Sequence, residues 1–181
     1  MIAAVVLAAG FSRRLGYEKQ TLEVGFETLI ARAVRVAGEA GLTPVVVVVN
    51  SAFSEALPGC DVVVNELAEE GMASSIRCGV ERVRDVGASG VVVMACDQVG
   101  LEAEHLRELC AEPERVTGSG YAGKVGIPAY FPAATFGELL GLSGDVGARG
   151  LLVGAAAVVD EGLALDVDTP EDVERARRLV G

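Results

Sequence analysis

The chain has 181 residues, of which 51% are apolar, so it is long enough to bury the core of one ordinary domain covering residues 1–181. Its 15 Lys and Arg residues are outnumbered by 26 Asp and Glu residues, which gives a net charge of −11. Such acidity argues against a broad electrostatic attraction to nucleic acid or to an anionic membrane surface, and we expect neither as a partner.

The beginning of the chain, MIAAVVLAAG, has no basic segment before its apolar run, and arginines soon interrupt that run. We therefore expect neither a signal peptide nor a membrane span, and we expect the protein to be cytoplasmic. The cysteines stand far apart without a C-x-x-C pair, which predicts reduced, partly buried thiols rather than a zinc site or a disulfide framework. They are Cys60, Cys78, Cys96 and Cys110.

Valine-rich runs in the first half of the chain are apolar throughout rather than alternating. This pattern is typical of strands that are buried on both faces of a parallel sheet. The predicted strands cover residues 2–7, 45–49, 61–64 and 91–95.

Amphipathic segments separate these runs and predict helices over residues 28–39, 74–86 and 101–109. The alternation of strands and helices predicts an α/β domain with helices on both faces of the sheet. His105, the only histidine, borders the apolar stripe of the third helix. We expect an exposed helix residue there rather than a general base.

The second half of the chain changes character. Glycines and prolines in residues 118–133 suggest a loop or hairpin insertion rather than another βα unit. Residues 144–153 read as a short helix with Asp145 as its N-cap. Thr169 and the proline after it predict the start of a last helix, whose buried stripe would hold Val173, Ala176 and Val180.

Positive charge gathers in the segment after the first predicted strand, which reads LAAGFSRRLGYEK. Five residues separate Gly10 from the next glycine and a tyrosine follows it, so the segment is not a Walker A loop. It does not open directly into a helix, so it is not a dinucleotide fingerprint either. What remains is a long loop in which Gly10 allows close backbone approach, while Arg13, Arg14 and Lys19 can surround an anion.

Asp97 follows the strand predicted at 91–95 and should therefore emerge at the carboxyl edge of the sheet, where open α/β folds bind ligands. One or two carboxylates together with phosphate oxygens suffice to hold Mg²⁺. Simpler roles remain open: Asp97 as a turn residue, Asp168 in an Asx turn before the last helix, and Ser74 as a helix cap.

The loop from Leu7 to Lys19 resembles the signature L-A-[AG]-G-x-S-x-R-[ML]-G-x-x-K of MobA-like nucleotidyltransferases. Within that class the chain most resembles the MocA type, the molybdenum cofactor cytidylyltransferases. Further matching segments are Asn65, G-M-A-S-S-I at 71–76, C-D-Q at 96–98, G-x-P at 126–128, G-D-x-G-A-R at 144–149 and D-x-D-T-P-E-D at 166–172.

The resemblance implies a Rossmann-like, three-layer α/β domain of the nucleotide-diphospho-sugar transferase type, with a mostly parallel mixed sheet. The nucleotide would lie across the carboxyl ends of the strands. The catalytic residues would be Arg14, Lys19 and Asp97. Nucleotide would be bound by Leu7, Ala8, Ala9, Gly10, Arg14, Lys19, Asn65, Gly71 and Ser75. The acceptor would be bound by Gly126, Pro128 and Asp145.

The resemblance also implies a reaction, in which CMP passes from CTP to the terminal phosphate of molybdopterin and pyrophosphate is released. Asp97 would bind Mg²⁺, with Asp168, or else Asp166, as a second ligand. A molybdenum hydroxylase would receive the modified cofactor.

Ala9 favours CTP, because the GTP-using MobA type has glycine at this position. Alternatives are GTP as donor, a sugar or polyol phosphate as acceptor, and a molybdenum cofactor carrier or chaperone without turnover. Two departures from the family pattern are Val99 where proline is usual, and Gln20 with Thr21 where apolar residues are common.

Overall fold

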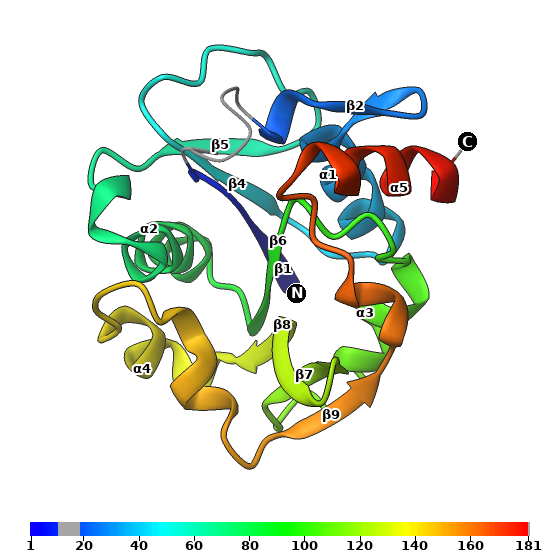
Figure 1. The fold of residues 1–181 in the computed structure, drawn as a ribbon. Helices are drawn as coiled ribbons and strands as arrows, with labels where there is room; N and C mark the ends of the chain where they lie inside the picture. Colours follow the sequence, from blue (N-terminus) through cyan, green and yellow to red (C-terminus); the bar gives the residue numbers. More distant parts are fainter. Residues whose placement is uncertain (11–18, 181) are drawn as a thin grey trace.

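A computed structural model describes residues 1–10 and 19–180 of the chain. Its main sheet has seven strands in the order β5-β4-β1-β6-β8-β7-β9 (Figure 1). The strands are β1 (Ile2–Ala8), β4 (Val45–Val49), β5 (Asp61–Val64), β6 (Gly90–Ala95), β7 (Thr117–Tyr121), β8 (Lys124–Pro132) and β9 (Ala156–Val159). A separate hairpin pairs β2 (Glu23–Val24) with β3 (Glu27–Thr28).

The central strands confirm the prediction of a parallel sheet buried on both faces. β1 pairs in parallel with β4 on one side and with β6 on the other. All five residues of β4 are buried. The predicted bounds 45–49 and 61–64 agree with β4 and β5, while β1 extends one residue further and β6 begins one residue earlier.

Helices cover both faces of the sheet, as predicted (Figure 1). One face packs against α1 and α3, through residues such as Ile30 and Leu106. The other packs against α2 and α4, through residues such as Ile76 and Leu139. The helices are α1 (Leu29–Glu39), α2 (Met72–Asp85), α3 (Ala103–Leu109), α4 (Phe136–Leu140) and α5 (Pro170–Val180). Short 3₁₀ helices are η1 (Lys19–Thr21), η2 (Ala68–Glu70), η3 (Ala133–Thr135), η4 (Gly147–Leu152) and η5 (Glu161–Ala164).

The last helix starts as predicted and closes the fold over the β2–β3 hairpin. Thr169 and Asp172 form a reciprocal cap: the Thr169 backbone N–H donates to the Asp172 carboxylate at 3.0 Å, and the Asp172 N–H donates to Thr169 Oγ1 at 3.3 Å. Val173 and Ala176 pack in a cluster with Val24 of β2. The side chain of Val180 lies outside those that the structure describes.

The glycine-rich stretch 118–133 does form a hairpin, but it is not an insertion. Its two strands, β7 and β8, belong to the main sheet, where β8 pairs antiparallel with both β6 and β7. Among the described strands of this sheet, β8 alone runs against the others. Gly118 and Gly120 permit this packing, because a Cβ on either would approach a valine side chain within 3.2 Å.

The prediction that Asp145 caps its own helix was wrong. η4 begins after Val146, and the Asp145 carboxylate instead accepts a hydrogen bond from the backbone N–H of Met72 at 3.3 Å. Asp145 therefore accepts a hydrogen bond from one of the free backbone N–H groups at the start of α2, a helix far away in the sequence. The local pattern of an acid before a short helix could not reveal this long-range partner.

His105 is buried, which corrects the prediction of an exposed residue: only 6% of it is accessible. Its Nε2 lies 2.7 Å from Ser119 Oγ, and that hydroxyl donates to the Pro128 carbonyl at 2.6 Å. Since the serine proton is used, the imidazole Nε2–H must be the donor to Ser119. α3 contacts β7 and β9 as well as β8, and these strands cover the face of the helix that the apolar stripe leaves open.

All four cysteines are thiols, three of them half-buried and Cys96 buried. Of the helices in residues 1–10 and 19–180, none has the length and apolar character needed to cross a membrane.

We predict that His105 makes stability fall as the pH falls. Burial lowers the pKa of His105, although the charges of Asp160 and Glu108 oppose the shift. The unfolded chain therefore binds a proton at about pH 6.5, where the folded protein does not, so stability is lost progressively below that value. Urea unfolding of the wild type and of His105→Gln at about pH 7.5 and about pH 5 measures the effect. Parallel losses of stability in both proteins would contradict it.

Candidate active site

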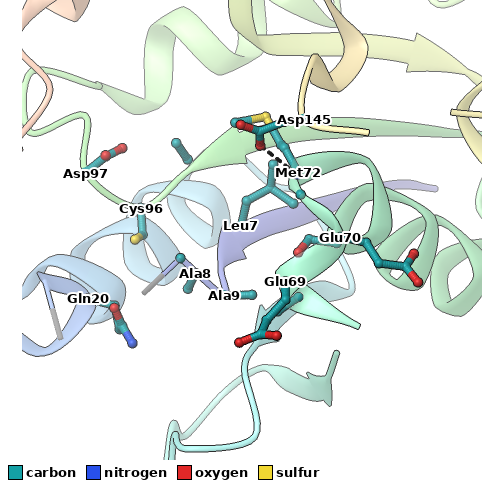
Figure 2. A pocket seen from close by; sticks show the side chains of 15 residues that line it. Leu7, Ala8, Ala9, Gln20, Glu69, Glu70, Met72, Cys96, Asp97 and Asp145 are labelled. Carbon is teal, nitrogen blue, oxygen red and sulfur yellow. Dashed lines mark hydrogen bonds between the residues drawn. The ribbon is translucent and has the colours of Figure 1, made fainter. Parts of the chain in front are cut away.

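A cavity of about 460 Å³ opens where β1 and β6 end side by side (Figure 2). Leu7 of β1 is in register with Ala95 of β6. The order of the strands reverses at β1: β4 and β5 lie on one side of it in the sheet, and β6 lies on the other. Such a reversal of strand order leaves a crevice for ligands. The lining residues are Leu7, Ala8, Ala9, Gly10, Gln20, Ala68, Glu69, Glu70, Gly71, Met72, Ser75, Ala95, Cys96, Asp97 and Asp145.

The first wall is the end of β1 and the residues after it. Ala8 and Ala9 are buried, while Gly10 is exposed. A Cβ built on Gly10 would meet no described atom within 4 Å, so the glycine leaves open space beside the backbone. Arg14, which the sequence assigns to the same loop, lies outside the described residues, and only the backbone of Lys19 is described.

Asp97 lies on a second wall, two residues after the end of β6, with 9% of its surface exposed. The segment around Val167 runs beside it: Gln98 and Asp166 form an antiparallel bridge, and the Val167 N–H donates to the Asp97 carbonyl at 3.3 Å. Asp166 is exposed and Asp168 is half-buried. The structure thus brings both candidate partners of Asp97 to the same edge of the sheet.

The start of α2 forms a third wall and includes Gly71 and Ser75. Gly71 has φ +104°, and a Cβ on it would lie 2.8 Å from Asp145 Cα and 2.9 Å from the Gly144 carbonyl oxygen. Only glycine fits this close approach in this conformation. The turn before η4 is therefore pressed directly against the start of α2.

Asn65, which the resemblance assigns to the nucleotide, is not among the described residues that line the cavity. It is 5% exposed, and its amide donates to Ser74 Oγ at 2.8 Å and to Ser75 Oγ at 3.0 Å. Its Oδ1 accepts from the Leu67 N–H at 3.0 Å. Asn65 thus orients Ser75 and the segment that leads to α2.

The three residues predicted to bind the acceptor are divided between two places. Asp145 lines the cavity, whereas Gly126 and Pro128 lie on β8. Val93 of β6 pairs with Ala129, so the first residues of β8 extend beyond the end of β6. The early part of β8 therefore projects past the carboxyl edge of the sheet, next to the side where Asp97 emerges.

Tyr121 links this projecting strand, β8, to Gln98, the residue that follows Asp97. Its hydroxyl donates to the Ile127 carbonyl at 2.8 Å and accepts from Gln98 Nε2 at 3.3 Å. Burial is the main cause that raises the pKa of Tyr121; the charges of Asp166 and Asp97 add to the rise, and Arg149 opposes it. Charged groups of both signs thus lie near the Tyr121 hydroxyl.

The described lining of the cavity is acidic. It includes Glu69, Glu70, Asp97 and Asp145, and no Lys or Arg is found among the described residues that line it. Glu70 is paired with Arg77 of α2 at 3.3 Å. A polyanionic ligand in this cavity would therefore need positive charge from elsewhere, such as a metal ion or the basic loop.

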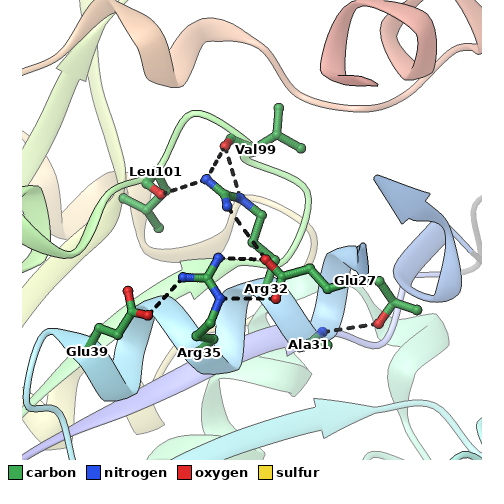
Figure 3. A network of polar contacts seen from close by, with 8 residues as sticks. Glu27, Ala31, Arg32, Arg35, Glu39, Val99 and Leu101 are labelled. Carbon is green, nitrogen blue, oxygen red and sulfur yellow. Dashed lines mark hydrogen bonds and ion pairs between the residues drawn. The ribbon is translucent and has the colours of Figure 1, made fainter. Parts of the chain in front are cut away.

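Arg32 of α1 holds the segment that follows Asp97, a role that the sequence did not indicate (Figure 3). Its Nε and Nη2 donate to the Val99 carbonyl at 3.1 and 2.9 Å, and Nη2 also reaches the Leu101 carbonyl at 3.5 Å. Glu27, at the β2–β3 hairpin, lies 3.7 Å from Arg32 and also binds Arg35. The network joins the hairpin and α1 to the loop that carries Asp97.

Sequence reasoning also missed other members of the lining, among them Glu69, Met72 and Cys96. Met72 and Cys96 belong to the segments G-M-A-S-S-I and C-D-Q that carry the family resemblance, so those segments were a usable signal although no role was assigned to either residue. Glu69 belongs to η2, which has no capping or periodic signature.

The model of the MobA-like NTP transferase domain matches residues 4–159. The chain belongs to this family of nucleotidyltransferases. The match covers most of β1 and the whole of β6 and α2. The predicted family and the predicted nucleotide-diphospho-sugar transferase fold are thereby confirmed.

Named relatives and solved structures agree with this placement. The chain is 34% identical to purine catabolism protein PucB of Bacillus subtilis, over 99% of this chain and 97% of the relative. It is 33% identical to a probable molybdenum cofactor guanylyltransferase of Opitutus terrae, over 60% and 54% of the two chains.

Among solved structures, Rv0371c of Mycobacterium tuberculosis H37Rv superposes with a TM-score of 0.85 and 35% identity, over 98% of this chain and 97% of that one. Its manganese complex superposes with a TM-score of 0.81 and 32% identity, over the same shares of the two chains.

We predict that Arg32→Met destabilises the protein by about 1–3 kcal/mol, because buried carbonyls of the Asp97 loop lose charged donors. Arg35→Met is the matched control, since the Arg35 side chain is 43% exposed and pairs at the surface. It should lose no more than about 1 kcal/mol. Urea unfolding measures both variants, and equal losses would contradict the role of Arg32.

Proposed function

We propose that this protein is a molybdenum cofactor cytidylyltransferase, which transfers CMP from CTP to the terminal phosphate of molybdopterin. The observation that carries the proposal is the cavity between β1 and β6, whose lining includes both Asp97 and the first residues of the family loop, Leu7 to Gly10. Family membership supports nucleotidyl transfer, and the name of the Opitutus relative supports a molybdenum cofactor acceptor.

The proposed chemistry is an in-line displacement. An oxygen of the acceptor's terminal phosphate attacks the α-phosphorus of CTP, the bond to the bridging α–β oxygen breaks, and pyrophosphate leaves with its electron pair. The nucleophile is already an anion, so the protein needs no strong general base and no covalent intermediate. His105 is consistent with this, because it is buried away from the cavity and bonded to Ser119.

The protein's main task is then to position the reactants and to stabilise negative charge. The described lining is acidic, so we assign the binding of the triphosphate to Arg14 and Lys19, with Gly10 allowing close backbone approach. Leu7, Ala8 and Ala9 would support the nucleotide from the end of β1. Gly71 and Ser75 would contact its base or ribose, with Asn65 holding Ser75 in place.

The residues present fit a divalent metal of the hard type. Asp97 is a buried carboxylate at the cavity, and Asp168, or else Asp166, lies along the neighbouring backbone segment. No group of three acidic, histidine or cysteine side chains able to hold a metal occurs in the described part of the chain. One or two carboxylates suit Mg²⁺, which takes its other ligands from phosphates and water. When bound, Mg²⁺ would neutralise charge on the phosphates; the manganese complex of Rv0371c supports a divalent ion.

CTP is the proposed donor because of Ala9. This residue is 5% exposed and lines the cavity, so its methyl group occupies volume that a glycine would leave to a larger base. A narrower site favours the pyrimidine over guanine. The PucB relationship, which covers nearly the whole chain, is compatible with an enzyme that differs from the guanylyltransferases.

For the acceptor we propose the side of the cavity toward the projecting part of β8, near Gly126 and Pro128, with Asp145 at the cavity itself. The charge of Arg149 lowers the pKa of Tyr121 in this region, so Arg149 offers positive charge for a phosphate. A molybdenum hydroxylase would then receive the modified cofactor. We place this reaction in the cytoplasm.

We predict magnesium-dependent release of pyrophosphate with CTP and molybdenum-loaded molybdopterin, and little release with GTP, ATP or UTP. A panel of sugar and polyol phosphates tests other acceptors, and nucleotide binding without release would favour a carrier instead.

Ala9→Gly tests the choice of donor, because the extra space should raise the use of GTP relative to CTP. Equal rates with CTP and GTP in the wild type would overturn the proposed donor.

We also predict that Asp97→Asn and Lys19→Met each lower turnover by about 10²–10³-fold, since charge stabilisation in the transition state is lost. The unfolding temperature should change little. Asp85→Asn, at the exposed end of α2, is the control and should keep full turnover. Full Mg²⁺-dependent activity of Asp97→Asn would show that Asp97 has no metal-binding role.

A further inference from the structure

Gln20 is a buried amide at the edge of the cavity. It belongs to η1, directly after Lys19, and only 1% of its surface is exposed. Its side chain lines the cavity together with Ala8 and Cys96. Its Nε2 is inaccessible to solvent and has no hydrogen-bond partner among the residues that the structure describes.

An amide donor buried without a partner destabilises a folded protein. A methionine or leucine would fill the same volume without this cost. An unpartnered donor that lines a cavity of about 460 Å³ therefore points to a ligand with an acceptor atom.

Gln98 is the other buried glutamine with an unpartnered side-chain atom in the described chain, but its surroundings differ from those of Gln20. It too is buried, at 5% exposure, and its Oε1 lacks a partner within the described chain. Its Nε2, however, donates to the Ile127 carbonyl at 3.2 Å, and Gln98 borders an internal void of only about 10 Å³. No organic ligand fits that void, whereas the cavity beside Gln20 has room for a nucleotide.

The position of Gln20 indicates which part of a nucleotide it would meet. Figure 2 shows Gln20 and Asp97 on one side of the cavity, and Met72 and Glu70 on the other. The start of α2 is the side to which we assign the base, and the side of Asp97 is the one to which we assign the phosphates. The N–H groups of an amide are donors, and phosphate oxygens are strong acceptors.

We propose that Gln20 Nε2 donates a hydrogen bond to a phosphate oxygen of the bound nucleoside triphosphate, on the part that leaves as pyrophosphate. Gln20 is then a neutral phosphate-binding residue, and it directly follows Lys19 in the sequence. This inference rests on the proposed nucleotidyl transfer, and it adds a residue that the family loop does not include.

Gln20→Met tests the proposal, because it keeps the volume and removes the donor. Isothermal titration with Mg²⁺ and either CTP or inorganic pyrophosphate should show affinity lower by about tenfold for both probes. Without ligand, the unfolding temperature of Gln20→Met should equal or exceed that of the wild type, since a buried Nε2 donor without a partner in the described chain is gone. Gln98→Met is the comparison for stability: it removes a bonded amide and should unfold at a lower temperature.

Lower affinity together with an equal or higher unfolding temperature identifies a ligand-binding role. Substitution of a purely structural residue would not produce this combination. If the wild type binds CTP and pyrophosphate and Gln20→Met binds them equally well, the role of Gln20 is refuted while nucleotidyl transfer stands. A joint loss of stability and affinity would also refute it, in favour of a structural role. If the wild type binds neither probe, the proposed function itself fails.

Discussion

The parallel pairing of β1 with two neighbours is the constraint on which the site depends. Because β4 and β6 flank β1 in parallel, their carboxyl ends meet at one edge, and the chain must leave that edge in opposite directions. The crevice that results brings Gly10 and Asp97 into the lining of one cavity, although the two are far apart in the sequence. Hydrophobic burial of the valine strands thus fixes the polar site, since a shift in register would separate its walls.

Features that arise from local patterns were predictable from the sequence. The apolar runs gave the strands, with the bounds of β4 and β5 correct, and Thr169 with Pro170 gave the start of α5. The edge of the sheet at which Asp97 emerges followed from the same patterns. The motifs at Leu7–Gly10, Gly71 and Ser75 do meet around one cavity.

Features that arise from contacts between distant segments were not predictable. Asp145 has the local setting of a helix cap, yet its partner is the start of α2. His105 borders an apolar stripe, and only the packing of α3 on β7 and β9 buries it. Arg32 carries no local signal at all, because the carbonyls that it holds are placed by tertiary structure. Gln20 departs from the family pattern, but its burial emerges only in the fold.

The contact between the start of α2 and the turn before η4 restricts how this enzyme can change during evolution. Gly71 lies against Asp145 and Gly144, and a Cβ on Gly147 would lie 2.6 Å from Met72 Sδ. Two glycines thus interlock the segments from both sides, so substitutions in one segment are not independent of substitutions in the other. A lineage that reshapes the side of the cavity to which we assign the base must alter both segments together. Nucleotide preference in such proteins should therefore change in coordinated steps rather than one residue at a time.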